Sequence, residues 1–328
     1  MRNDNSLIKK RFNNFARNFR KSTTFSIALI LLGLCVFLTI TTGTKFLSKN
    51  NLLSVFRQFS FTAILAIGQA LVIITGGIDL SVGSIFAFSS VVSALGMTRW
   101  GFNTFVGLLI GCLIGAALGL SNGFFITKLR LPPFIATLGM MSIARGLAYV
   151  VTGGFPVSGL PSAFKFIGQG DILGIPSPII LMLILAVIFG FFLHKTIIGR
   201  RIYAIGGNQE AARVSGIRVD RIKLLVYTLC GLLSAISGLA TAARLNVAQS
   251  TAGQGIEMDA IAAVIIGGAS LSGGIGNIAG PILGAAIMGI IRNGLILLNV
   301  TAYWQQTVIG AVVIIAVTFD KMRNQMAD

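Results

Sequence analysis

Two glycine-rich octapeptides carry much of the polar chemistry in an otherwise apolar chain. Residues 76–83 read GGIDLSVG and residues 267–274 read GGASLSGG, so five of the eight positions are identical. In lipid an unpaired backbone group is costly, and a broken helix persists only where protein or water satisfies it. A break that recurs in two halves of a membrane chain indicates a translocation pathway where the halves meet. The candidate pathway residues are Gly76, Gly77, Asp79, Ser81, Gly83, Gly267, Gly268, Ser270, Ser272, Gly273 and Gly274.

Asp79 follows the first break and is one of only nine acidic residues. Ionised groups at membrane depth are costly and usually functional, so contact with a substrate or an ion is one interpretation. The other is capping, since a carboxylate at a helix start accepts hydrogen bonds from free amides and complements the helix dipole. Ser81 and Ser84 are placed to share that task. Ser270 occupies the equivalent position in the second copy, which favours capping because no charge is needed there.

Arg145 is a second charge predicted to lie within the membrane. It falls about eleven residues into the apolar run 134–151, near mid-membrane at a rise of about 1.5 Å per residue. A lone cation there needs a carboxylate, and we expect a structural pair with Asp79 or Asp259. Glu257 and Asp259 also lie near the expected outer mouth of the pathway, where docking or gating is a further interpretation.

The remaining reactive residues form no catalytic set. His194 is the only histidine, and the motifs of serine hydrolases and zinc peptidases are absent. The three cysteines fall inside apolar runs without metal-ligand spacing and are interpreted as small apolar side chains. No glycine is followed by lysine, so the chain has no phosphate-binding P-loop. We therefore expect no enzymatic site, cofactor or metal, and any ATP must be hydrolysed by another polypeptide.

Composition identifies the elements that position these residues as membrane helices. The 328-residue chain is 55% hydrophobic and 11% charged, with a mean hydropathy of +0.88. Since roughly 20 apolar residues cross a bilayer core, its apolar runs predict an all-α polytopic membrane protein with about ten transmembrane helices. The eighth run is short and ends on the second glycine break, so we interpret it as a half-helix. The expected spans are 25–43, 58–75, 82–97, 102–126, 134–151, 178–193, 224–243, 259–269, 278–298 and 303–319.

The basic residues indicate the orientation of these spans. Most of the 26 lysines and arginines lie on segments 1–24, 127–133, 194–223 and 320–328, which share one side of the membrane if there are ten spans. Excess cation marks the cytoplasmic side, so both termini are expected in the cytoplasm. The net charge of +17 is spread over short loops beside apolar runs, which favours contact with anionic lipid and argues against nucleic acid.

A single membrane domain is expected to fill the chain. It consists of a basic cytoplasmic N-terminal segment over 1–24, a transmembrane domain over 25–319 and a cytoplasmic tail over 320–328. In this topology the turn-rich segment 152–177 lies outside the cell, and the polar loop 194–223 lies inside.

The fourth span carries a glycine at every fourth position from Gly107 to Gly123. Residues four apart share one helix face, so this span presents a groove for close approach of another helix. Tight packing is the main interpretation, and a sliding pathway is the alternative.

The loop 194–223 contains a motif with a specific geometric expectation. Residues 206–216 read GGNQEAARVSG, and a helix from about Gln209 to Ser215 that stops at Gly216 would form a compact knob. Glu-Ala-Ala followed by glycine resembles the loop by which permeases of ATP-binding-cassette importers dock onto their ATPase subunits. The candidate coupling residues are Gly207, Asn208, Glu210, Ala211, Ala212, Arg213 and Gly216.

From about residue 50 the chain resembles the ribose-type monosaccharide permease family, which includes ribose, xylose, galactoside and autoinducer-2 importers. The similarity lies in 66–84, the Glu-Ala-Ala loop and 251–289, and its most specific part is 76–83 with 267–280. The resemblance implies a dimer of two permeases, an ATPase subunit that binds ATP and Mg, and an extracytoplasmic sugar-binding protein. Branched-chain amino acid permeases are more distant relatives with similar glycine breaks.

The leading hypothesis is the permease subunit of a bacterial sugar importer that uses ATP hydrolysed by a separate subunit. The alternatives are an ion-coupled secondary transporter of a small polar solute, an importer permease for autoinducer-2 or branched-chain amino acids, and a channel. Ion coupling requires membrane carboxylates that titrate, and Asp79 and Asp259 are the candidates. The identity of the sugar, the pairing of identical or different permeases and the residues that line the route are left open.

Overall fold

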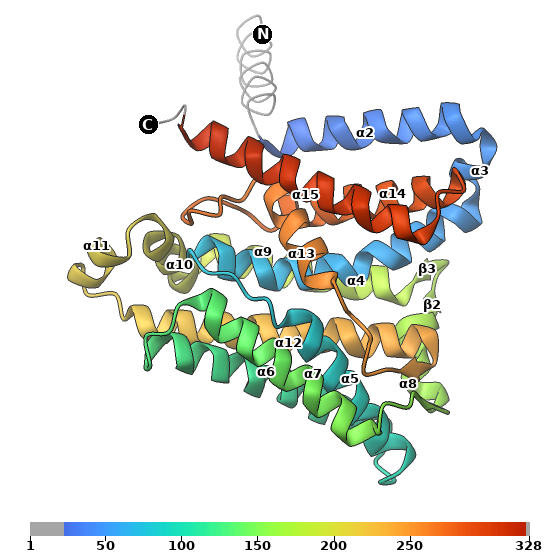
Figure 1. The fold of residues 1–328 in the computed structure, drawn as a ribbon, viewed down its shortest axis with the longest axis horizontal. Coiled ribbons are helices and arrows are strands. Elements are labelled where there is room, and N and C mark those ends of the chain that lie inside the picture. Colours follow the sequence, from blue (N-terminus) through green and yellow to red (C-terminus); the bar gives the residue numbers. More distant parts are fainter. Residues whose placement is uncertain (1–22, 326–328) are drawn as a thin grey trace, which may run out of the picture.

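The computed structural model describes residues 23–325, which form a bundle of α-helices (Figure 1). Residues 1–22 and 326–328 lie outside the described part, and with them most of the expected N-terminal segment. The all-α fold predicted from composition is confirmed, since every long element described is a helix. The helices are α2 (Thr23–Thr42), α3 (Thr44–Leu47), α4 (Lys49–Ile74), α5 (Val82–Thr98), α6 (Thr104–Thr127), α7 (Pro133–Thr152), α8 (Ser162–Gln169), α9 (Ser177–Lys195), α10 (Ile197–Gly207), α11 (Gln209–Val214), α12 (Val219–Leu245), α13 (Ile256–Ile266), α14 (Ala279–Leu297) and α15 (Ala302–Gln325).

Each of the ten expected spans corresponds to one of these helices. Within the described residues, seven helices are long and apolar enough to cross a membrane, and α5 and part of α15 are shorter apolar helices. The largest difference in bounds is at α4, which begins at Lys49 instead of near residue 58. Ser48 explains the earlier start, because its hydroxyl accepts a hydrogen bond from the Asn51 amide and caps the helix.

The short eighth span is a half-helix, as predicted. α13 has 11 residues, which at a rise of 1.5 Å per residue gives about 16 Å, roughly half of a bilayer core of about 30 Å. The chain runs back from the end of α12 before α13 begins, and it likewise runs back from the end of α4 before α5 begins (Figure 1). Both connections are irregular backbone within the bundle, where polar groups must find partners in the protein.

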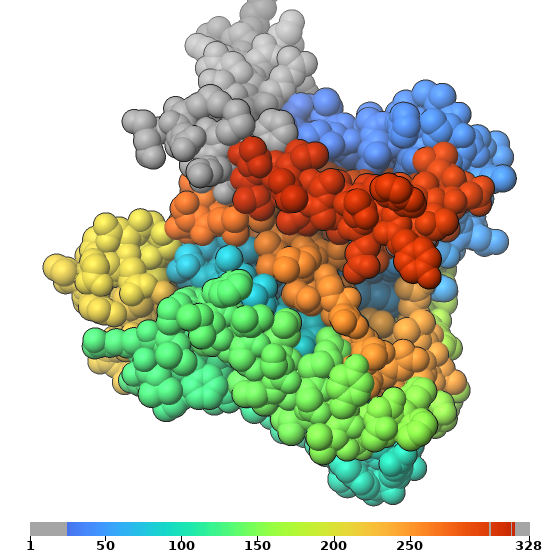
Figure 2. Space-filling view, in the orientation of Figure 1, coloured from blue at the N-terminus to red at the C-terminus, as the bar shows by residue number. Residues whose placement is uncertain are grey.

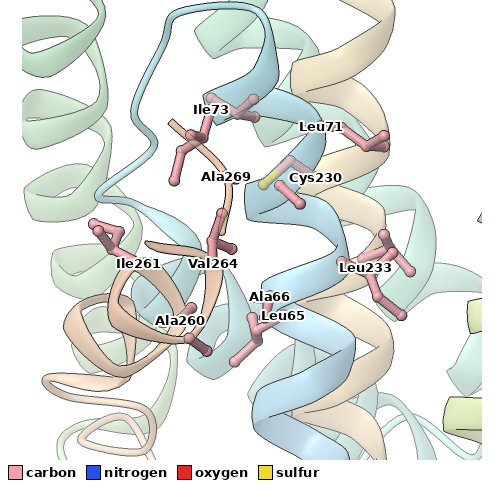
Figure 3. Close-up of a cluster of buried hydrophobic side chains, with 14 of the residues drawn as sticks. Leu65, Ala66, Leu71, Ile73, Cys230, Leu233, Ala260, Ile261, Val264 and Ala269 are labelled. Atoms are coloured by element: carbon pink, nitrogen blue, oxygen red, sulfur yellow. The ribbon is translucent and has the colours of Figure 1, made fainter. Parts of the chain in front are cut away.

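α4 is the central helix of the bundle. Its residues are buried almost without interruption from Phe59 to Ile74, and it packs on α9, α12, α13 and α14. Figure 3 shows part of this core, with Cys230 of α12 and Val264 of α13 beside α4. Because neighbouring helices cover α4, van der Waals packing within the protein holds it in place.

Close helix packing accounts for the glycine row of the fourth span. All five glycines of that row are buried, and α6 makes its most extensive contact with α12. A Cβ on Gly115 would collide with the backbone of Gly231, and a Cβ on Gly119 with the backbone of Tyr227. The two helices therefore touch backbone to backbone along the row.

The bundle has two distinct ends. One end carries α10 and α11 together with the α6–α7 turn, and we call it the α11 end (Figures 1 and 2). The opposite end carries α8 and the small strands, and we call it the α8 end (Figure 1).

Two small antiparallel sheets lie at the α8 end. β1 (Val157–Ser158) pairs with β4 (Val247–Ala248), with Val157 opposite Ala248. β2 (Asp171–Ile172) pairs with β3 (Ile175–Pro176), with Asp171 opposite Pro176. The first sheet joins the turn-rich segment after α7 to the connection between α12 and α13.

The outside of the bundle exposes large apolar side chains. Ile40 of α2, Phe105 of α6 and Val187 of α9 are 78%, 73% and 72% exposed. Soluble monomers rarely present apolar surface of this extent, whereas a lipid bilayer accommodates it. The surface thus agrees with the length of the helices in identifying a multi-pass membrane protein.

Replacing Gly119 with alanine is expected to destabilise the protein, because the new Cβ would overlap the carbonyl oxygen of Tyr227. Overpacking of this kind costs about 1–3 kcal/mol, which a lower midpoint of thermal unfolding in detergent should report. Gly139→Ala in α7 is the matched control, since a Cβ there meets nothing within 4 Å and alanine favours a helix. Equal midpoints for the two variants would contradict the backbone contact.

Candidate functional site

The two glycine breaks predicted from the sequence meet at the α11 end. α4 ends at Ile74, and the Gly274 amide donates a hydrogen bond to the Ile74 carbonyl across 2.9 Å. Gly76 and Gly273 adopt the left-handed backbone conformation, with φ of +75° and +88°, which glycine enters without steric cost. A Cβ on Gly273 would lie 3.0 Å from the Gly76 amide nitrogen. The two breaks are therefore in direct backbone contact.

Helix α10 completes this contact. Gly206, next to the last residue of α10, lies so close to the Ile74 carbonyl and the Gly274 amide that a Cβ would overlap both. A Cβ on Gly273 would in turn lie 2.8 Å from the Gly206 carbonyl oxygen. We refer to Ile74, Gly76, Gly206, Gly273 and Gly274 as the glycine junction. No side chain separates the three segments at these contacts, so α10 lies in backbone contact with the end of α4 and with the second break.

A side-chain hydrogen bond also ties α10 to the second break. The Tyr203 hydroxyl, about one turn before Gly206, donates to the Gly276 carbonyl oxygen across 2.7 Å. Burial raises the pKa of the Tyr203 hydroxyl above its usual value. This bond and the glycine junction fix α10 to the second break at two points.

Asp79 organises the turn before α5. Its carboxylate accepts hydrogen bonds from the Ser81 amide at 2.8 Å, the Ser81 hydroxyl at 2.6 Å and the Asn122 side-chain amide at 3.4 Å. The Gln69 side chain, with its amide oriented to satisfy both of its groups, donates to the Asp79 carbonyl at 3.2 Å and accepts from the Asp79 amide at 3.1 Å. All four residues are buried. Ser81 is itself the N-cap residue of α5, so Asp79 holds the start of the helix from two residues before the N-cap.

Ser270 repeats this arrangement in the second break. The Ser270 hydroxyl accepts a hydrogen bond from the Ser272 amide at 3.2 Å, just as Asp79 accepts from the amide two residues further on. The Ser270 amide donates to the Ile275 carbonyl at 3.1 Å, and Gly268 has a left-handed φ of +86°. These bonds satisfy backbone groups that the break removes from the helical pattern.

Gly77 and Gly267 leave no room for a side chain. A Cβ on Gly77 would collide with the side chain of Tyr227, and a Cβ on Gly267 would lie 2.5 Å from the Gly280 carbonyl oxygen of α14. Both glycines are buried. The repeated glycine pair at the start of each break thus serves close packing as well as chain reversal.

The expected pairing of Arg145 with Asp79 or Asp259 is wrong. The Arg145 guanidinium donates instead to the carbonyl oxygens of Ser250 and Ala252, the latter at 2.7 Å. Both acceptors lie in the irregular connection between α12 and α13. Carbonyls there have no helical partners, and an arginine presents five N–H donors to satisfy them.

Asp259, in the first turn of α13, forms an ion pair with Arg292 of α14 at 2.7 Å. The Asp259 side chain is 13% exposed and the Arg292 side chain 37%, so the pair is partly removed from water. This pair joins the half-helix α13 to α14. Both predicted intramembrane charges, Arg145 and Asp259, are therefore engaged within the protein.

The starts of α5 and α13 also touch. A Cβ on Gly253 would lie 2.8 Å from the Gly83 carbonyl oxygen, and a Cβ on Gly83 would lie 2.6 Å from the Glu257 carboxylate. From this contact α5 runs to the α8 end and α13 runs toward the α11 end (Figure 1). Opposed broken helices of this kind form the binding region of many transporters.

The predicted knob is present as α11, within one residue of its expected bounds. The Asn208 side chain accepts a hydrogen bond from the Ala211 amide at 2.9 Å and caps the helix, and Gly216, with φ of +81°, lies just beyond its end. Glu210 and Arg213 form an exposed pair at 3.6 Å on its rim. Figure 2 shows this segment projecting from the α11 end.

Two further predicted residues attach the knob to the bundle. Ala212 is the buried residue of α11, with 4% of its surface exposed. A Cβ on Gly274 would lie 2.9 Å from the Gly207 amide nitrogen, so the link between α10 and α11 also touches the second break. The knob therefore projects from the bundle and is also packed against it.

The residues predicted from the sequence do not include Gly206, Tyr203, Gln69 or Gly253, which the structure places in these contacts. A signal existed for Gly206, since it begins a Gly-Gly pair like those that open both breaks. A lone tyrosine in a basic loop looks like any interfacial aromatic residue, so nothing local marks Tyr203.

Comparison with known proteins agrees with this geometry. The model of the family described as branched-chain amino acid transport system / permease component matches residues 51–317. The ribose import permease protein of Bacillus subtilis (strain 168) is 48% identical over 282 residues, which cover 85% of this chain and 87% of the relative. The ribose import permease protein of Escherichia coli (strain K12) is 44% identical, covering 90% and 94%. The D-allose transport system permease protein of the same strain is 39% identical, covering 96% and 95%.

No match to a solved structure was found. The sequence relatives confirm the resemblance drawn from the glycine breaks and the knob, and they extend it over nearly the whole chain. On this evidence the chain belongs to the branched-chain amino acid transport system / permease component family.

Proposed function

We propose that the chain is the membrane permease subunit of a bacterial importer that moves a ribose-like monosaccharide across the inner membrane. ATP hydrolysed by a separate subunit supplies the energy. The observation that carries the proposal is the contact of α10 with the end of α4, just before the first break, and with the second break at the glycine junction. A partner that displaces α11 also displaces α10, and with it the ends of the two elements between which a substrate would pass. A transporter driven by another polypeptide needs such a link.

In this proposal the α11 end faces the cytoplasm and the α8 end faces outward. Excess cation marks the cytoplasmic side of membrane proteins, and the α11 end carries the larger share of basic residues. Both termini then lie on the cytoplasmic side. The basic residues of the α11 end are Lys128, Arg130, Lys195, Arg200, Arg201, Arg213, Arg218, Arg221 and Lys223.

A sugar is favoured over an amino acid as the substrate. The family description names branched-chain amino acids, but the relatives that align over most of their length are named for ribose, D-allose and xylose. The polar groups around the starts of the half-helices include the hydroxyls of Ser81 and Ser84 and the amide of Asn122, beside the carboxylates of Asp79, Glu257 and Asp259. Such groups suit a neutral polyol. Autoinducer-2 and branched-chain amino acids are the alternative substrates.

The proposal assigns a partner to each end of the bundle. An ATPase subunit, which binds ATP and Mg, docks on α11. An extracytoplasmic sugar-binding protein docks on 152–177 and 244–258, which β1 and β4 join at the α8 end. A second permease copy completes a homodimer in the bilayer.

Transport follows from moving the glycine junction. Closure of the ATPase subunits on ATP displaces α11, and α10 passes the displacement to both breaks. The buried hydroxyls of Ser84, Ser89 and Ser93 on α5, and of Tyr227 on α12, have no hydrogen-bond partner in the described structure. Leaving such groups unpaired costs about 1–3 kcal/mol each, so water or sugar hydroxyls that enter an open route would satisfy them.

The direct test is ATP hydrolysis in liposomes that contain this chain, its neighbouring ATPase and its binding protein, scanned over a substrate panel. A panel of ribose, allose, xylose, autoinducer-2 and leucine separates the candidate substrates, and we expect a pentose or hexose to stimulate hydrolysis. Glu210→Ala should abolish the stimulation without disturbing the fold, since the Glu210 side chain is 75% exposed. Val187→Ala, on a lipid-facing residue of α9 that is 72% exposed, is the control. Uptake driven by a proton gradient without ATPase would refute the proposal.

Substitution of Asp79 separates its structural role from ion coupling. Asp79→Ala removes the acceptor of three hydrogen bonds in a buried site, and we expect a loss of about 3 kcal/mol or more in stability. Asp79→Asn keeps an oxygen acceptor, so most of the stability and the ATP-driven uptake should survive. An ion-coupled transporter would behave in the opposite way: Asp79→Asn would fold well and lose all gradient-driven uptake. Thermal unfolding and sugar uptake, measured on the same preparations, distinguish the two.

Tyr203→Phe should uncouple hydrolysis from transport. The substitution removes the hydrogen bond between α10 and Gly276 but leaves α11 and its docking residues unchanged. We expect the ATPase to bind normally while the number of sugars moved per ATP falls several-fold. Tyr149→Phe, on an exposed tyrosine in α7, should leave that ratio unchanged. A normal ratio in Tyr203→Phe would show that the glycine contacts alone suffice for coupling.

A further inference from the structure

A cleft of about 860 Å³ opens at the α11 end, between the α6–α7 turn on one side and α11 with the start of α12 on the other. Its wall is strongly basic, because a single acidic residue, Asp220, lines it against six cations. The six basic residues are Lys128, Arg130, Arg213, Arg218, Arg221 and Lys223.

Two of these cations are engaged within the protein. Arg213 lies 3.6 Å from Glu210 and 3.9 Å from Asp220, and the Lys223 ammonium donates to the Gln209 side chain at 2.6 Å. The other four have no carboxylate within 4.0 Å in the part of the chain that the structure describes. These four are Lys128, Arg130, Arg218 and Arg221, and all are exposed.

The orientation of the protein in the membrane does not by itself account for the position of these six cations. The positive-inside tendency places cations anywhere on the cytoplasmic loops, whereas these cations converge on one concave surface from two segments about 80 residues apart in sequence. A cleft lined by one sign of charge concentrates its field and attracts the opposite charge. The geometry of the cleft therefore points to an anionic occupant.

The position of α11 identifies that occupant. Gln209 and Arg213 of α11 form part of the cleft wall, so any protein that docks on α11 also covers the cleft. The volume is sufficient for several side chains of a partner. We propose that the cleft receives an acidic segment of the ATPase subunit, beside the segment that grips α11. This inference rests on the proposed function and adds to it a second, electrostatic contact with the same partner.

The test is a titration of purified permease, in detergent, with the ATPase subunit encoded beside it, at stepped NaCl concentrations. Arg130→Glu with Arg218→Glu should weaken binding by about tenfold or more at low salt and should flatten the dependence of affinity on salt. Arg130→Lys with Arg218→Lys should bind like the wild type. Arg99→Glu with Lys49→Glu reverses two exposed cations outside the cleft and so controls for the same change in net charge. Equal unfolding midpoints establish that the reversed variant is folded.

Three outcomes would overturn a part of this scheme. Unchanged affinity and salt dependence in the reversed variant, with Glu210→Ala still weakening binding, refutes the acidic contact and leaves the proposed function intact. Loss of co-purified phosphatidylglycerol from the reversed variant, with unchanged ATPase affinity, assigns the cleft to lipid and also refutes the proposal. A wild-type permease that binds no ATPase at any salt concentration refutes the proposed function itself.

Discussion

Backbone groups that leave a helix inside a bilayer must find partners within the protein, and the polar residues of this chain lie where that requirement is strictest. The Gly274 amide of the second break donates to the Ile74 carbonyl at the end of α4, so each of these two groups has a partner. Inside the two breaks, the side chains of Asp79 and Ser270 accept hydrogen bonds from the backbone amides two residues further on. Arg145 donates a hydrogen bond to a backbone carbonyl oxygen in the turn before α13. These residues therefore make two broken helices possible, and in the proposed function the pathway lies around them.

Glycine serves two different mechanical purposes in this bundle. Along α6 the glycines let two long helices touch over many turns, and such a contact cannot shift without many simultaneous clashes. At the glycine junction the contacts join the ends of α4 and α10 to the loops of the two breaks, and the hydrogen bonds of Gly274 to Ile74 and of Tyr203 to Gly276 accompany them. The same residue type thus forms a long seam between α6 and α12 and a compact joint of three segments at the α11 end.

Features that depend on neighbouring residues in the sequence, such as helices, were predicted well. Contacts between distant residues were not, because no short stretch of sequence marks them. The spans follow from apolar length, and α11 follows from Asn208 and Gly216, which act within one helical turn. The partner of Arg145 could not be predicted, because a carbonyl acceptor exists at every residue and leaves no mark in the sequence. The contact of Gly206 with Ile74 depends on three segments that are each more than 60 residues apart. That proximity is a property of the whole fold. The Gly-Gly pair could therefore indicate that Gly206 matters but not that it contacts Ile74.

The burial of α4 has a consequence for how the bilayer acts on this protein. Helices such as α2, α6 and α9 present apolar side chains to lipid, whereas α4 is enclosed by other helices from Phe59 to its end at the glycine junction. Changes in bilayer thickness are accommodated by tilting of lipid-facing helices and by adjustment of the lipid itself. The helix that ends in the joint is therefore insulated from the thickness of the membrane. The side chains of α4 are matched to the neighbouring helices and not to lipid. The joint can therefore keep one geometry in membranes of different lipid content.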